Sequence, residues 1–112
     1  MKNKLYILWT NDNSNTAHLM VFMYAINSIL RGWWDDVTII IWGPSAKLVA
    51  ENNGIQDKIQ MAKDQGVHVS ACIACATEYG VVDKLRSLDL EVIPWGEPLT
   101  EIIQSNQHII TI

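Results

Sequence analysis

The sequence alternates short runs of strand-forming residues with longer segments of helical periodicity, and this alternation constrains the fold more than any other feature. The clearest run, DVTIIIWG at 36–43, is apolar and β-branched almost throughout. Such a run is typical of a strand buried on both faces of a parallel sheet. Further runs with strand character lie at residues 4–10, 67–71, 90–95 and 107–112. We therefore expect five strands.

Helical segments separate these runs. In residues 16–32, apolar side chains recur at the spacing of an amphipathic helix, and Gly32 is suited to end that helix. Other helices are predicted at 43–52, 55–66, 73–89 and 97–106, with a bend or break at Gly80. Strands joined by helices of this length indicate βαβ crossovers. The sequence predicts one domain over residues 1–112, a three-layer α/β/α sandwich with a five-stranded, mainly parallel sheet, flavodoxin-like or doubly wound.

Charge and hydropathy exclude two classes of partner. The chain has a net charge of −4, and its 8 Lys and Arg residues form no basic stripe, so we expect no nucleic-acid partner. No apolar run approaches the roughly 18 residues of a membrane span, and the first residues lack the pattern of a signal peptide. We expect a cytoplasmic protein without a membrane partner.

Both cysteines of the chain, Cys72 and Cys75, lie where a predicted strand gives way to a helix, within VHVSACIACATEYG at 67–80. Free N–H groups and the positive end of the helix dipole stabilise a thiolate at such a position. This pair is therefore the candidate catalytic site. A zinc site needs about four ligands, whereas the chain has no second CxxC and His68 and His108 begin their strands. We expect no metal and no cofactor.

Ligands of open parallel sheets bind beyond the carboxyl ends of the strands. If the strand order is 2-1-3-4-5, the first and third strands are neighbours, and Cys72 faces the loop at 10–16 across a crevice. Several of the five tryptophans are expected to line a pocket or a subunit interface. The candidate pocket residues at this edge are Thr10, Asn11, Asp12, His18, Trp42, Gly43, Ser45 and Trp95.

Two long segments resemble the DsrE/DsrF-like proteins, which are small α/β proteins of sulfur relay: MVFMYAINSILRGWWDDVTIIIWGPSAKLVAEN and GVHVSACIACATEYGVVDKLRSLDLEVIPWGEPLTEII. The resemblance covers essentially the whole chain. In active members of that family, a cysteine opens the helix after the third strand, with a glycine eight residues later; Cys72 and Gly80 match that spacing. The resemblance implies a persulfide on Cys72, donor and acceptor proteins, and assembly into homo- or hetero-oligomers; we expect a homo-oligomer, either a trimer or a hexamer.

Cys75 lies outside the minimal pattern of that family, so three functions stay open. The first is sulfur handling, as a sulfurtransferase or a carrier, with a persulfide on Cys72 and Cys75 as an auxiliary thiol. The second is a CxxC dithiol–disulfide redox module. The third is a non-catalytic, oligomeric protein that binds a small molecule and uses both cysteines as core residues.

Overall fold

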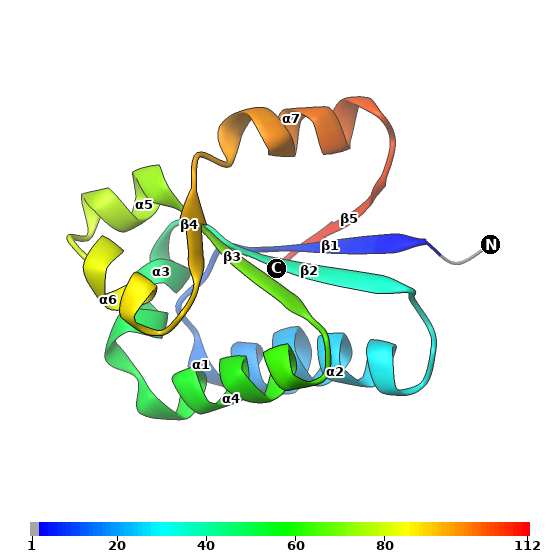
Figure 1. Ribbon diagram of the computed structural model, residues 1–112, viewed down its shortest axis with the longest axis horizontal. Coiled ribbons are helices and arrows are strands. Elements are labelled where there is room, and N and C mark those ends of the chain that lie inside the picture. Colours follow the sequence, from blue (N-terminus) through cyan, green and yellow to red (C-terminus); the bar gives the residue numbers. More distant parts are fainter. Residues whose placement is uncertain (1–2) are drawn as a thin grey trace.

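The computed structural model of the chain describes residues 3–112, in which five parallel strands form a sheet with helices on both faces (Figure 1). The strands are β1 (Lys4–Trp9), β2 (Asp36–Ile41), β3 (His68–Cys72), β4 (Glu91–Ile93) and β5 (His108–Thr111). The helices are α1 (Ser14–Thr16), η1 (Ala17–Phe22), α2 (Met23–Leu30), α3 (Pro44–Glu51), α4 (Asn53–Asp64), α5 (Ile73–Glu78), α6 (Val82–Ser87) and α7 (Gly96–Gln104). The predicted fold class is confirmed, and every strand pair in the sheet is parallel.

Two glycines end helices as the sequence predicts. The helix expected at 16–32 is a continuous helical segment made of α1, η1 and α2, with η1 in π-helical form. It ends at Leu30, and Gly32 follows with a φ of 67°. Gly80, with a φ of 69°, separates α5 from α6. Positive φ is a conformation that glycine adopts without steric cost, so each glycine stops the helix before it.

The strand order is β4-β3-β2-β1-β5, which corrects the assumed order 2-1-3-4-5. β2 lies between β1 and β3, and these two strands are not neighbours. The chain steps in one direction from β1 to β4 and then returns past β1 to the opposite edge. Because βαβ connections are right-handed, the return must use the other face of the sheet. Accordingly, α7 covers the face opposite α2 and α4 (Figure 1).

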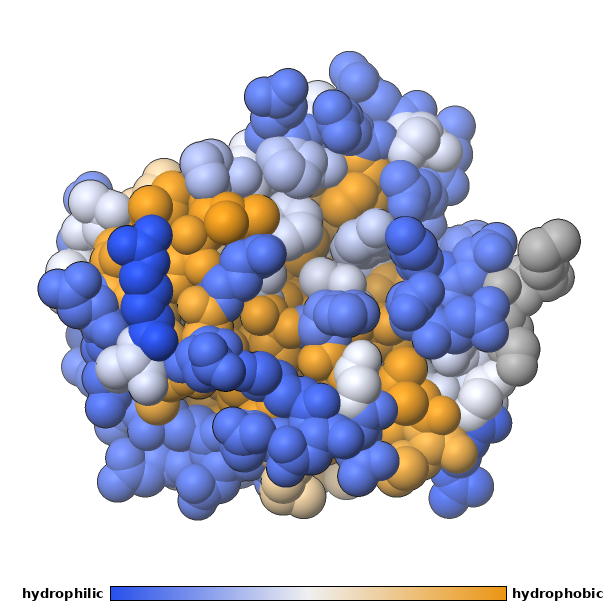
Figure 2. Space-filling model, in the orientation of Figure 1, coloured by the Kyte–Doolittle hydropathy of each residue, from blue (hydrophilic) through white to orange (hydrophobic). Residues whose placement is uncertain are grey.

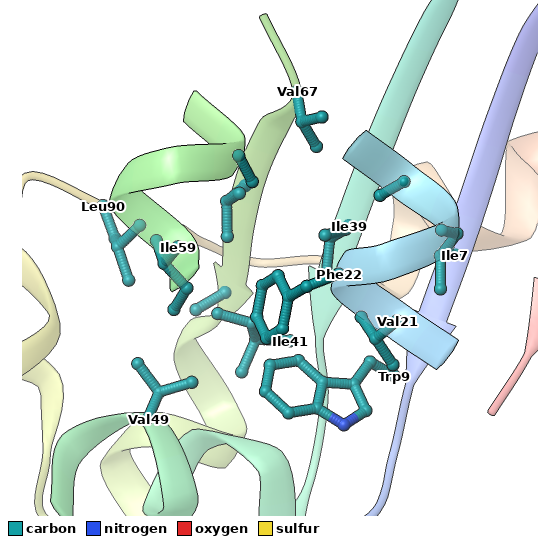
Figure 3. Close-up of a cluster of buried hydrophobic side chains, with 14 of the residues drawn as sticks. Ile7, Trp9, Val21, Phe22, Ile39, Ile41, Val49, Ile59, Val67 and Leu90 are labelled. Atoms are coloured by element: carbon teal, nitrogen blue, oxygen red, sulfur yellow. The ribbon is translucent and has the colours of Figure 1, made fainter. Parts of the chain in front are cut away.

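The face under α2 and α4 carries the larger core. It joins strand side chains to Val21, Phe22 and Ile59 from the helices (Figure 3). Trp9 is fully buried at the end of β1 and packs edge-on against Phe22, with ring centroids 5.4 Å apart. The second face carries a smaller cluster around Ile40 and Ile102. This asymmetry matters because the smaller cluster holds Cys72 as a buried member and Cys75 as a partly buried neighbour.

Candidate functional site

Cys72 is the last residue of β3 and the N-cap of α5. Its side chain is 3% exposed and belongs to the small cluster with Ile40, Trp95 and Ile102. The position at the helix start agrees with the sequence expectation. Its burial, however, closes Cys72 to a bulky reactant in this conformation.

Cys75 lies one helical turn further on and is half-buried. It opens onto a pocket of about 330 Å³ that is also lined by Gly43, Glu78 and Tyr79. Burial raises the pKa of the Cys75 thiol above its ordinary value, and the neighbouring Cys72 side chain raises it further, whereas the N–H groups of Gly43 and of Cys75 itself act in the opposite direction. Most of the accessible Cys75 thiol is therefore protonated near neutral pH.

The turn after β2 brings a backbone N–H group to Cys75. Ser45 is fully buried, and its Oγ donates to the carbonyl of Trp9 at 2.7 Å and accepts from the N–H of Trp42 at 3.0 Å. These bonds fix the turn in which Gly43 adopts a φ of 68°. Ser45 therefore serves as a structural residue, and Gly43 is the member of this turn that reaches the Cys75 pocket.

Trp95 borders the buried thiol. Its side chain is 7% exposed and packs in the same cluster as Cys72 and the half-buried Trp42. Its indole Nε1 donates to Ser70 Oγ at 2.7 Å. Two of the predicted pocket tryptophans thus gather around Cys72, but as packing residues within a core cluster.

The remaining predicted pocket residues lie elsewhere because β2 separates β1 from β3. Thr10 bonds to the carbonyl of Ile112 through its N–H at 2.7 Å and its Oγ1 at 3.1 Å. Asn11 accepts from the N–H of Asn13 through Oδ1, and Asp12 is exposed. His18 is half-buried in η1, where a Cβ at Gly54 would lie 3.9 Å from its Nε2. The prediction of a crevice between this loop and Cys72 is wrong, because it assumed that β1 and β3 are neighbours in the sheet.

The sequence interpretation missed Glu78 and Tyr79, which line the Cys75 pocket. Their positions three and four residues after Cys75 place them on its side of the helix, so helical spacing was an available signal. It also missed Ser70, two residues before Cys72 and on the same face of β3. Within residues 3–112, no group of three or more His, Cys, Asp or Glu side chains is placed to hold a metal ion.

Cys72 opens a short helix after the third strand, as the resemblance to the DsrE/DsrF-like proteins implies. The model of the DsrE/DsrF-like family matches residues 4–112. The chain belongs to the DsrE/DsrF-like family. This family is generally linked to sulfur relay. A comparison with curated proteins finds no match.

Solved structures of DsrE-like fold resemble this chain over nearly its full length. The conserved protein of unknown function BT1422 from Bacteroides thetaiotaomicron is 41% identical, with a TM-score of 0.94, over 97% of this chain and 94% of that one. The ychN protein from E. coli is 15% identical with a TM-score of 0.69, and MTH1491 of unknown function from Methanobacterium thermoautotrophicum is 15% identical with a TM-score of 0.71. Both of these matches cover 100% of each chain and show the shared fold.

Among the helices of residues 3–112, none is both long enough and apolar enough to cross a bilayer.

Proposed function

We propose that the protein handles sulfane sulfur on its two cysteines, as a carrier or a sulfurtransferase. The observation that supports this most is the direct interaction of two free thiols, Cys72 and Cys75, at the carboxyl end of β3 in a chain of this family. Neighbouring thiols can exchange a sulfur atom without a further cofactor.

The difference in burial assigns the two thiols different steps. Cys75 meets the donor, because its sulfur opens onto a pocket, whereas Cys72 is 3% exposed. The Cys75 thiolate attacks the outer sulfur of a donor persulfide. The S–S bond of the donor breaks, its thiolate leaves, and Cys75 holds the transferred sulfur as a persulfide. Thus the persulfide forms first on Cys75, and not on Cys72 as the family pattern implies.

Cys72 is then the second thiol of the pair. Its thiolate can attack the outer sulfur of the Cys75 persulfide, which leaves a persulfide on Cys72 and returns Cys75 to a thiolate. Alternatively, a partner thiolate takes the outer sulfur directly from Cys75. The N–H groups of Gly43 and Cys75 favour the anionic sulfur at Cys75 in either case.

The proposal includes partners and location. A donor protein that carries a persulfide and an acceptor protein with a thiol would meet the chain at the Cys75 pocket. We expect a cytoplasmic homo-oligomer, either a trimer or a hexamer, in which the exposed tryptophan and methionine side chains lie at subunit contacts. The tryptophan and methionine side chains with the greatest exposed fractions are those of Trp33, Met23 and Met61.

A dithiol–disulfide module is the second candidate, and the same thiol–thiol contact supports it. In this function Cys72 and Cys75 each lose one hydrogen and one electron to an oxidant, and no sulfur is taken up. The two functions differ in the mass of the product, so one measurement separates them.

The test is the intact mass of the reduced protein after incubation with polysulfide, thiosulfate or a cysteine desulfurase with cysteine. We expect a gain of one sulfur mass that reductant removes. Cys75→Ala should abolish the gain, whereas Cys72→Ala should retain it. Loss of two hydrogens without sulfur uptake would support the redox module instead. A gain that persists in Cys75→Ala but disappears in Cys72→Ala would return the first step to Cys72.

A further inference from the structure

The face of the sheet under α7 is only partly covered, and this leaves a cleft. Helices normally cover both faces of a parallel sheet, so its strands are apolar on both sides. Here a cavity of about 570 Å³ lies on the α7 face beside β2, β3 and β4. It is separate from the pocket at Cys75. In Figure 2, hydrophobic surface is visible below α7, between that helix and hydrophilic surface along the lower edge of the molecule.

The strand residues under α7 divide into two halves. Towards the carboxyl ends they are apolar or sulfur-bearing, and they form the cluster of Ile40, Cys72 and Ile93. Towards the amino ends they are polar, and Tyr6, Thr38 and Ser70 line the cleft. Hydroxyl groups at interior strand positions are costly where a helix covers them. Their placement indicates a face built to hold water or a polar ligand.

A chain of hydrogen bonds fixes a carboxylate at the wall of this cleft. Trp95 Nε1 donates to Ser70 Oγ at 2.7 Å, and Ser70 Oγ donates to Glu91 Oε1 at 2.6 Å. Trp95 and Ser70 are 7% and 4% exposed, so packing holds both donors in place. Within residues 3–112, Glu91 Oε2 accepts no hydrogen bond and Glu91 forms no ion pair. The carboxylate is therefore oriented in advance and has an oxygen free to accept from a ligand.

The other charges of the cleft do not neutralise Glu91. The Lys63 ammonium lies at its rim, but its Nζ donates to the Asp89 carbonyl at 2.6 Å and lies 3.6 Å from Asp89 Oδ2. This pair leaves the Glu91 carboxylate without an ion-pair partner among the described residues, and His68 is the other basic side chain of the lining. A carboxylate-bearing or phosphate-bearing ligand would be repelled, whereas an ammonium group would be attracted.

We propose that this cleft is a binding site for a small molecule with an ammonium group, which donates to Glu91 Oε2 while hydroxyl groups of the ligand bond to Thr38 and Tyr6. The site is independent of sulfur handling at Cys75, because it lies on the α7 face and uses none of the residues of that pocket. It is nevertheless close to Cys72, which packs with Trp95 behind the Ser70 wall.

The test uses three probes with the same four-methylene chain that differ only in their end groups: putrescine, 1,4-butanediol and adipate. Binding is followed by two-dimensional NMR of the full chain, and Trp95→Phe identifies the Trp95 indole signal. We expect putrescine to shift that signal saturably and the other two probes to leave it nearly unchanged. Glu91→Gln keeps an oxygen for Ser70 and removes the charge, so it should weaken putrescine binding at least about tenfold. The matched control is Glu101→Gln, on an exposed residue of α7.

Three results would overturn the proposal. The first is an equal response to all three probes, which would show that charge does not select the ligand. The second is undiminished putrescine binding in Glu91→Gln. The third is a Trp95 signal that no probe shifts, as when a second copy of the chain covers this face in solution. None of these results bears on sulfur uptake by Cys75.

Discussion

The two faces of the sheet use the same strands for different purposes, and β2 shows this most clearly. Val37, Ile39 and Ile41 point to the face under α2 and α4 and are fully buried. The alternate residues Thr38 and Ile40 point to the α7 face. Ile40 is fully buried there, whereas Thr38 is half-buried and lines the cleft. The number of helices available to cover each face accounts for the difference. The covered face supplies stability, and the other face leaves room for a ligand.

The largest expected effect compares adjacent residues that point to opposite faces. Ile39→Ala should lower the free energy of unfolding by about 2–5 kcal/mol, because it removes a buried side chain and leaves a cavity. Thr38→Ala should cost less than about 1 kcal/mol, since that side chain faces the cleft. Urea denaturation of both variants measures the contrast. Equal losses would mean that the cleft is filled in solution.

The next effect concerns the hydrogen bonds that hold the cleft wall. Ser70→Ala leaves the buried Trp95 Nε1 without its acceptor, which should cost about 1–3 kcal/mol of stability. Ser105→Ala is the matched control, because its exposed Oγ donates to carbonyls of α7 and accepts from Gln107 Nε2, so no buried group loses a partner. Thermal unfolding of the two variants compares them. A Ser70→Ala protein as stable as the control would show that water replaces the lost acceptor.

A third prediction compares the two thiols directly. Cys75 should react with iodoacetamide at least about tenfold faster than Cys72, because Cys72 must wait for the cluster around Trp95 to open. The single-cysteine variants Cys72→Ser and Cys75→Ser, followed by mass spectrometry, give the two rates. Trp95→Ala should speed the reaction of Cys72 and leave that of Cys75 nearly unchanged. Faster labelling of Cys72 would contradict the assignment of Cys75 as the thiol that meets the donor.

The smallest effect is a dependence of stability on pH. Burial raises the pKa of Cys75 in the folded state, so its protonated form stabilises folding below its ordinary pKa. This contribution is lost as the pH rises through the raised pKa. The free energy of unfolding should therefore fall more steeply with pH, above the ordinary thiol pKa of about 8.5, in the parent protein than in Cys75→Ser. Parallel curves for the two proteins would mean that the Cys75 thiol titrates alike in the folded and unfolded chains.

Much of the fold could be predicted because strand and helix patterns are local. The positions of the five strands, the glycine stops at Gly32 and Gly80, and the start of a helix at Cys72 follow from neighbouring residues in the chain. The polar residues of the cleft were overlooked, although His68 and Ser70 alternate with apolar residues in the third strand run. A covered parallel strand would be apolar at those positions, so the pattern did contain the signal.

By itself, the sequence determined the parallel α/β architecture and placed both thiols at the junction of β3 and α5, because both depend on short-range periodicity. Only the tertiary structure decided the strand order, which separates His18 and the loop at 10–16 from Cys72. It also decided which thiol is accessible. Trp95 and Ile102, from later segments of the chain, cover Cys72 and leave Cys75 open. Burial of a side chain depends on contacts between segments distant in sequence, and no local pattern specifies which segments will meet.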